Sequence, residues 1–185
     1  MKQDITQRLK DEHQLILRML ALLEKNAKLT EEGHFHDYRF YLDGVDFIRN
    51  YADRFHHAKE EDVLFEALIE NGMPRENSPI AAMLMEHDQG RAFVRGMEES
   101  ATRALNGEPG QKEALVAYAR GYLDLLREHI SKEDDILYPL AERVLPAEIR
   151  DRIVAGYRKA EEKADQGFEA HYLSVVEGYE AKGAS

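Results

Sequence analysis

Apolar residues recur at three- and four-residue intervals along most of the chain, which is the period of an amphipathic α-helix. The first such segment spans residues 4 to about 27, and its apolar stripe contains Ile5, Leu9, Ile16, Leu20, Leu23 and Ala27. A second segment spans about 37 to 70, and its stripe contains Ile48, Ala52, His56, Glu60, Val63 and Ala67. No segment alternates apolar and polar residues in the way that a half-buried strand does. We therefore predict an all-helical protein.

Turn and capping residues mark the remaining helices. Ser78 and Pro79 predict an N-cap and a first turn. The third helix that they begin has an inner stripe of Ile80, Leu84, His87, Arg91 and Val94. After a loop at 106–110, a fourth helix from about 111 to 144 presents Leu115, Tyr118, Tyr122, Leu125, His129, Glu133, Ile136 and Leu140, with Pro139 at a late kink or in the last turns. A fifth helix from Pro146 to about residue 180 has Ile149, Ile153, Tyr157, Phe168, Tyr172 and Val176 on its apolar side.

Four long helices joined by short loops favour an up-down-up-down four-helix bundle. We assign residues 1–145 to this bundle and residues 146–185 to a C-terminal helical extension that packs on the bundle or projects from it. At 185 residues the chain is long enough to form one domain with a sizeable core.

Each of the four bundle helices carries a metal-binding type of residue within its apolar stripe. The residues are His13, His56, Glu60, His87, His129 and Glu133. Twice a His is followed four residues later by a Glu, an offset that places both side chains on one helical face. Burying such groups without compensation costs about a few kcal/mol each. Either a hydrogen-bonded network or a metal site supplies the compensation, and we favour the metal site because bundle cores recurrently hold dimetal centres.

The residue types narrow the choice of metal. The chain has no Cys, which excludes thiolate zinc sites, iron–sulfur clusters held by Cys, and disulfides. Imidazole and carboxylate ligands suit iron, and manganese or zinc as less favoured occupants. A closed structural zinc site needs four ligands, so six ligands favour two ions. With both carboxylates bridging, each ion retains open positions that O2, NO, peroxide or a bridging oxygen can fill.

Composition limits the partners. The net charge of −11 argues against a nucleic-acid partner. No apolar run is long enough to span a membrane, and the first residues lack the apolar core of a signal peptide. We therefore expect a cytoplasmic protein without a nucleic-acid or membrane partner.

The order of the motifs resembles the hemerythrin-like (HHE cation-binding) family in its variant with four His and two Glu. The matching pieces are residues 11–13, His56 to Glu61, Glu86 to Arg91 and His129 to Asp134, within about residues 8 to 142. The resemblance implies a non-haem di-iron centre, bridged by oxo or hydroxo groups and by carboxylates, in a four-helix bundle.

One departure from the oxygen-carrying hemerythrins lies on the third helix, and one shared spacing leaves two candidate carboxylates on the fourth helix. The carriers have a His-x-x-x-His pair on the third helix, whereas Met83 and Arg91 flank His87 here. The carriers also use His-x-x-x-x-Asp on the fourth helix, a spacing that His129 and Asp134 satisfy. We favour Glu133 over Asp134 as the bridging carboxylate, because an offset of five swings about 140° around an α-helix.

Several neighbours of the predicted ligands are expected to contact them without binding metal. These are His57, Glu61, Arg91, Tyr122 and Asp134. Residues 55–65 and 128–138 form a repeat that aligns on its Lys-Glu pairs, with His56 on His129 and Glu60 on Glu133. His57 lies about 100° from His56 on an α-helix and aligns with Ile130 of the second repeat. We expect His34, His36 and His171 at the surface.

These observations predict a di-iron protein that binds or reacts with a small diatomic or peroxide ligand, in oxidative or nitrosative stress or in iron homeostasis. Two alternatives remain: a module that holds or senses iron without turnover, and a reversible oxygen carrier. A ferritin-like carboxylate site, which uses Glu-x-x-His pairs on two helices, matches the four-residue spacing less well. The fifth helix offers a surface for a partner or for a homodimer.

Overall fold

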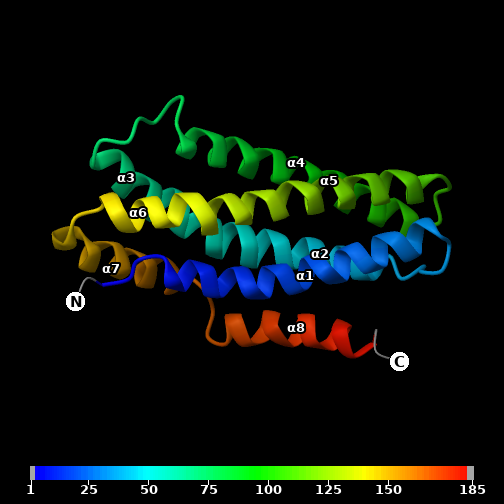
Figure 1. Ribbon diagram of the computed structural model, residues 1–185. Helices are drawn as coiled ribbons and strands as arrows, with labels where there is room; N and C mark the ends of the chain where they lie inside the picture. Colours follow the sequence, from blue (N-terminus) through cyan, green and yellow to red (C-terminus); the bar gives the residue numbers. More distant parts are fainter. Residues whose placement is uncertain (1–2, 183–185) are drawn as a thin grey trace.

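Long helices run up and down along one axis in the computed structural model, which describes residues 3–182 (Figure 1). The first half contains α1 (Gln7–Glu31), α2 (Arg39–Phe47), the π-helical stretches η1 (Ile48–His57) and η2 (Glu60–Phe65), α3 (Glu66–Glu70) and α4 (Pro79–Leu105). The second half contains α5 (Gln111–Lys132), the π-helical stretch η3 (Glu133–Leu137), α6 (Tyr138–Val144), the 3-10 turn η4 (Ala147–Ile149), α7 (Arg150–Glu161) and α8 (Phe168–Lys182). The described residues contain no strand. The prediction of a helical bundle with additional C-terminal helix is confirmed.

The second and fourth helices of the bundle are each continuous rods despite their changes of hydrogen-bonding pattern. Helical residues follow one another without a break from 39 to 70 and from 111 to 144. Ser78 caps α4 by accepting a hydrogen bond from the backbone N–H of Ala81, and Pro79 follows it in the first turn, as predicted. Pro139 lies in the first turn of α6, directly after η3.

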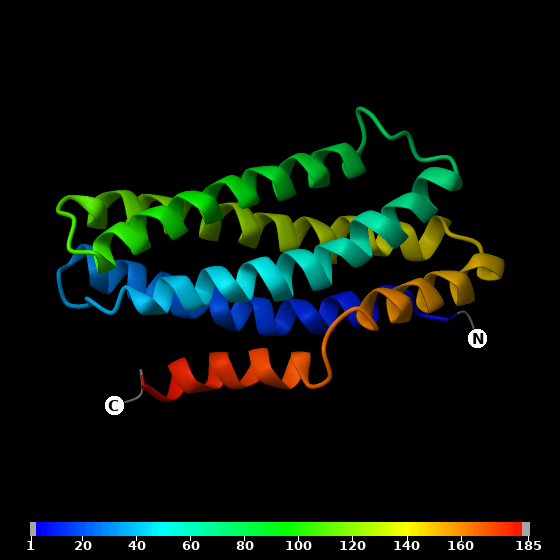
Figure 2. The same cartoon turned by 180° about the vertical axis from the view of Figure 1, so that it is seen from behind.

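The predicted fifth helix is wrong, because the chain forms two helices there. The α7 helix ends at Glu161, and α8 begins at Phe168 directly after Gly167, whose φ of +84° is in the left-handed region that favours glycine. Figures 1 and 2 show α8 alongside α1, whereas α7 lies at the end of the bundle where α1 begins. Two helices allow the extension to cover both places, and Tyr172 and Val176 of α8 join the buried core.

Two π-helical stretches change which residues face the core. Val63 and Ile136 were predicted to point inward, but Val63 is only partly buried and Ile136 is 59% exposed. Their neighbours Leu64 and Leu137 are buried instead. A π-helical turn contains more residues than an α-helical turn, because its hydrogen bonds run from residue i to i+5. The inward face therefore moves forward by one residue in both repeats.

Tyr118 is a further correction, since it was placed on the inner stripe of the fourth helix and is 40% exposed. Ala119 occupies the buried position between Leu115 and Tyr122. The Tyr118 ring lies instead over Gly96 of α4, at the edge of the contact between the two helices.

The buried residues form two apolar clusters, one toward each end of the bundle. Ile5, just before α1, and Leu9 belong to one cluster, and the buried apolar residues of α1 from Ile16 onward belong to the other. His13 lies between them in the sequence. Each of the other three bundle helices also contributes residues to both clusters. The predicted metal ligands lie where the helix passes from one cluster to the other. The polar residues thus form a layer between two apolar cores. No helix of the described residues is long and apolar enough to cross a membrane.

Candidate metal centre

All six predicted ligands lie in the polar layer and are almost completely buried. Their relative exposures are 0% for His13, His56, Glu60 and Glu133, 1% for His129 and 2% for His87. The residues come from α1, from η1 and η2, from α4, and from α5 and η3. His34, His36 and His171 are exposed, as predicted.

The ligand atoms gather into two groups that share one carboxylate. The first group consists of His13, His56, Glu60 and Glu133, and the second consists of His57, Glu60, His87 and His129. Within each group the potential ligand atoms all lie within 4.8 Å of one another. This arrangement has the dimensions of two adjacent cation positions.

His57 was expected beside the centre and is found within the second group. Its ring is 6% exposed and stacks on the ring of His87, with 3.8 Å between the ring centroids. The expectation assumed α-helical geometry, in which neighbouring residues diverge by about 100°. His57 ends the π-helical stretch η1, where the wider turn brings consecutive residues closer to one face.

The two predicted carboxylates each connect a His of one group with a His of the other. The Glu133 carboxylate has one oxygen 3.1 Å from His129 Nε2 and the other 3.3 Å from His13 Nε2. The Glu60 Oε2 atom lies 3.8 Å from His56 Nε2 and 3.5 Å from His87 Nε2. This is the placement that bridging carboxylates require.

Each of the five imidazoles has a carboxylate at its outer nitrogen. The Nδ1 atoms of His13, His56, His57, His87 and His129 lie 3.0, 2.8, 3.4, 2.7 and 2.9 Å from carboxylate oxygens of Asp134, Glu12, Asp53, Glu61 and Glu86. A carboxylate at Nδ1 keeps the ring proton there and leaves the Nε2 lone pair for a metal. All five rings are thus held in the ligating orientation.

Comparison with protein-family models agrees with the geometry in indicating a cation-binding domain. The model of the hemerythrin HHE cation binding domain matches residues 4–141, which is more than half of the chain. The chain belongs to the hemerythrin HHE cation-binding family. Searches of curated proteins and of solved structures find no match to it.

The hemerythrin-like centre leaves its own ligand atoms without hydrogen-bond partners. Among residues 3–182, the buried side-chain atoms that lack a partner are His56 Nε2, Glu60 Oε2, both carboxylate oxygens of Glu133, Tyr122 Oη and Arg150 Nε. Four of these six atoms converge on the two groups. In addition, His87 Nε2 and His129 Nε2 lie 3.0 Å apart, although both rings carry their proton-holding partner at Nδ1. Two lone pairs so placed repel unless a cation or proton separates them, so the residues fit bound cations.

The pKa shifts of the His and Glu residues in the centre likewise indicate that positive charge there would be stabilising. Burial lowers the pKa of His56 well below its ordinary value, and neighbouring His13 adds to this. Burial also raises the pKa of Glu60, and the adjacent Glu133 charge raises it further. His13 shows the opposite balance, because Asp134 and Glu133 outweigh its burial and raise its pKa to about 9. Both shifts favour the protonated forms of His13 and Glu60 beside Glu133.

Two lysines reinforce the carboxylates that orient His56 and His129. Lys59 contacts Glu12, and Lys132 contacts Glu86. Each lysine precedes a predicted ligand in a Lys-Glu pair of the repeat. The environments differ, because Lys59 is fully buried and also lies 2.9 Å from Glu161 of α7, whereas the Lys132 side chain is 38% exposed.

Two of the three remaining orienting carboxylates directly follow the Lys-Glu pairs of the repeat. Glu61 follows the first Lys-Glu pair and holds His87, whereas Asp134 follows the second pair and holds His13. Asp134 therefore lies outside the ligand-atom groups, with Glu133 at the centre.

Sequence reasoning missed several residues of the centre, namely Glu12, Asp53, Lys59 and Tyr138. Glu12 directly precedes the predicted ligand His13, as Glu86 precedes His87, so the sequence contained a signal for it. The Tyr138 hydroxyl donates a hydrogen bond to Glu60 Oε1 and lies 3.4 Å from His13 Nε2. The Tyr138 hydroxyl therefore contacts two members of the first group.

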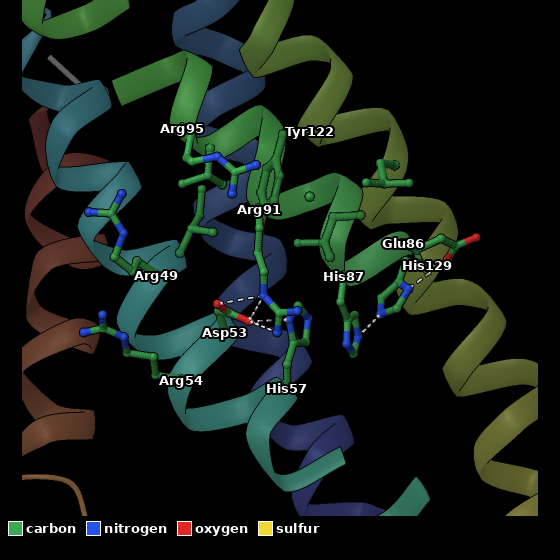
Figure 3. A pocket seen from close by; sticks show the side chains of 15 residues that line it. Arg49, Asp53, Arg54, His57, Glu86, His87, Arg91, Arg95, Tyr122 and His129 are labelled. Carbon is green, nitrogen blue, oxygen red and sulfur yellow. Dashed lines mark hydrogen bonds and ion pairs between the residues drawn. The ribbon is translucent and has the colours of Figure 1, made fainter. Parts of the chain in front are cut away.

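A cavity of about 290 Å³ reaches the second group only. His57, His87 and His129 line it, together with Tyr122 and Arg91, which were predicted to lie near the centre (Figure 3). Arg91 binds Asp53 and Glu61, and these carboxylates hold His57 and His87. No residue unique to the first group lines the cavity.

Proposed function

We propose that this protein is a non-haem di-iron protein whose second iron position receives a small oxidant or diatomic ligand. His13 and His56 would hold one ion, and His57, His87 and His129 would hold the other. Glu60 and Glu133 would bridge the pair. The proposal rests on one observation. Several potential ligand atoms are buried without a hydrogen-bond partner, and the imidazoles around them already have their outer nitrogens bound to carboxylates.

The donor atoms of the centre suit iron better than other cations. Imidazole and carboxylate donors without thiolate suit iron, and paired sites in bundle cores recur for di-iron proteins. When bound, two irons supply the one-electron changes that reactions of O2, peroxide or NO need. Manganese and zinc remain the alternative occupants, and the assay below separates them.

The chain itself determines where a ligand can approach. The cavity leads to the second group, whereas Tyr138 covers the first. The Tyr138 hydroxyl holds one Glu60 oxygen, which leaves Oε2 as the atom that both groups share. The carboxylate partners keep protons on the outer imidazole nitrogens, so the inner nitrogens need not deprotonate to bind an ion. We place the function in oxidative or nitrosative stress or in iron handling.

An iron-holding module without turnover is the second candidate, and one contact favours it. Glu161 of the C-terminal extension lies 2.9 Å from Lys59 and 2.8 Å from Arg8. Lys59 contacts Glu12, which orients His56. Iron occupancy would then be coupled to the packing of α7, and the extension would report it to a partner.

Stopped-flow spectroscopy of the reduced, iron-loaded protein tests the proposal. Mixing with O2, peroxide or NO should produce charge-transfer absorption in proportion to the protein and then further reaction. A stable oxygenated form that releases O2 under vacuum would indicate a carrier instead. The absence of any spectral response in an iron-loaded protein would leave the iron-holding module.

The variant His57→Ile tests the assignment of the second position. It gives the first repeat the residue that Ile130 supplies in the second repeat. We expect the iron content to fall from about two to about one per chain and the response to O2 or NO to disappear. His171→Ala, at an exposed His, is the control. Unchanged iron content in His57→Ile would show that His57 is not a ligand.

A further inference from the structure

The cavity beside the second group is much larger than a diatomic ligand requires. Its volume of about 290 Å³ equals the liquid volume of about ten water molecules. Ile48, Val94, Leu125 and Leu126 form apolar parts of its wall. The space therefore suits a small organic molecule with an apolar body.

The lining of the cavity is cationic in an acidic protein. Four arginines line it, namely Arg49, Arg54, Arg91 and Arg95, against the two carboxylates Asp53 and Glu86, whereas the whole chain has a net charge of −11. Figure 3 shows Arg49, Arg54 and Arg95 away from the imidazoles of His87 and His129. The charge of these three arginines thus lies away from His87 and His129, whereas Arg91 lies beside His57 (Figure 3).

Two of these arginines are not neutralised by the protein. Arg49 is paired with Glu98, and Arg91 is paired with Asp53, Glu61 and Asp88. Within residues 3–182, Arg54 and Arg95 form no ion pair, and Arg54 donates a hydrogen bond of 3.3 Å to Asn50. Both are exposed at the cavity. A guanidinium group presents a fork of donors that matches a carboxylate.

Tyr122 provides an independent sign of a ligand. Its side chain is 2% exposed and lines the cavity, and its hydroxyl has no hydrogen-bond partner in the described part of the chain. Most buried hydroxyls are partnered, because an unsatisfied one costs stability. A polar group of a bound molecule would supply the missing partner.

We propose that the cavity binds a small organic carboxylate. Its charged group would lie on the arginine-lined side of the cavity, where Arg54 and Arg95 lack a carboxylate partner, a polar atom of it would partner the Tyr122 hydroxyl, and its apolar body would lie against the apolar wall toward the imidazoles. The inference rests on the proposed function only in placing that body beside the second iron. Binding itself requires the cavity and its arginines.

Benzoate and its neutral analogue benzamide, which have the same size, are suitable probes. Titration calorimetry and ligand-observed NMR on the purified full-length protein, with its iron content measured, should show that benzoate binds at least about tenfold more tightly than benzamide. Higher salt should weaken benzoate binding, because exposed charges are screened. Inorganic phosphate should bind more weakly than benzoate, since it gains nothing from the apolar wall.

Variants locate the binding site. The double variant Arg54→Gln/Arg95→Gln should lose about tenfold in benzoate affinity and keep its affinity for benzamide, and Tyr122→Phe should lose a smaller factor. Arg103→Gln removes one arginine charge from an exposed position outside the cavity, on the helix α4 that also carries Arg95, and should leave binding unchanged.

Several results would overturn the inference. They are equal binding of benzoate and benzamide, phosphate binding as tight as benzoate binding, equal losses in Arg103→Gln and the double variant, and no binding by either method. Failure with two irons present would refute this inference alone. Benzoate binding to a protein that takes up no iron would refute the proposed function alone.

Discussion

Replacing Lys59 with methionine should destabilise the protein far more than the same change at Lys132. The two lysines hold equivalent places in the repeat and contact Glu12 and Glu86 respectively. Lys59 is 0% and Glu12 1% exposed, whereas Lys132 is 38% exposed at its side chain. The substitution keeps a long side chain and removes only the charge.

The burial of each pair sets the expected magnitude. Removing one partner of a buried ion pair costs ~3–5 kcal/mol when the other charge is left buried and uncompensated. For Glu12 this is an upper range, because Arg8 lies 3.1 Å from it and remains in place. An exposed pair contributes ~0.2–1 kcal/mol. Burial already raises the pKa of Glu12 to about 7 against the opposing effect of Lys59 and Arg8. Lys59→Met should therefore lower the melting temperature by roughly 6–20 °C, and Lys132→Met by a few degrees at most.

Urea unfolding and thermal melting, followed by far-ultraviolet circular dichroism, measure both effects. The double variant Glu12→Gln/Lys59→Met removes both buried charges and should recover much of the stability lost in Lys59→Met. Equal, small losses in the two single variants would refute the reasoning. So would a double variant less stable than the sum of its single changes predicts.

Three further predictions concern the centre and its cavity. Glu12→Gln should lower iron affinity by about 10–100-fold, because Glu12 orients His56. Competition with a chelator measures the affinity. Glu24→Gln is the control, because Glu24 is an exposed carboxylate in an ion pair with Arg127. Burial raises the pKa of Glu61, but hydrogen bonds from His87 and Arg91 outweigh it and hold the pKa at about 2 instead of 4.5. Glu61 therefore stabilises the protein above pH 4.5 and loses this contribution as the pH falls toward 2, so the difference in unfolding free energy between wild type and Glu61→Gln should narrow in acid; a constant difference would contradict it. Tyr122→Phe should leave the unfolding free energy unchanged or raise it by about 1 kcal/mol, because its hydroxyl has no partner; a loss in urea unfolding would show that the hydroxyl is bonded.

The fold was predictable because long helices with regular apolar stripes leave few arrangements. Leu9, Ile16 and Leu20 on α1 are buried as the three- and four-residue spacing predicts. Ser78 and Pro79 located the start of α4 to the residue. The break before Gly167 was not predicted, because the apolar spacing of the extension continues across it and a single glycine within a helical pattern is a weak signal.

The site was predictable in its inner residues and less so in their surroundings. His56 and Glu60 share a face in the sequence and in the structure. His57 lies within the second group of potential ligand atoms because it ends a π-helical stretch, whose wider turn the α-helical spacing used for the prediction does not include. The same π-helical geometry moves Leu137 inward in place of Ile136. The roles of Glu12 and Lys59 depend on contacts between helices far apart in the sequence.

The metal content of the protein purified from iron-supplemented cells, with an optical spectrum in air, tests the central claim most directly. The account predicts about two irons per chain, with the near-ultraviolet charge-transfer bands of a bridged ferric pair. Glu133→Ala should lose most of this iron, since Glu133 contacts a His of each group. A protein with no metal, or with one zinc and a featureless spectrum, would contradict the di-iron centre.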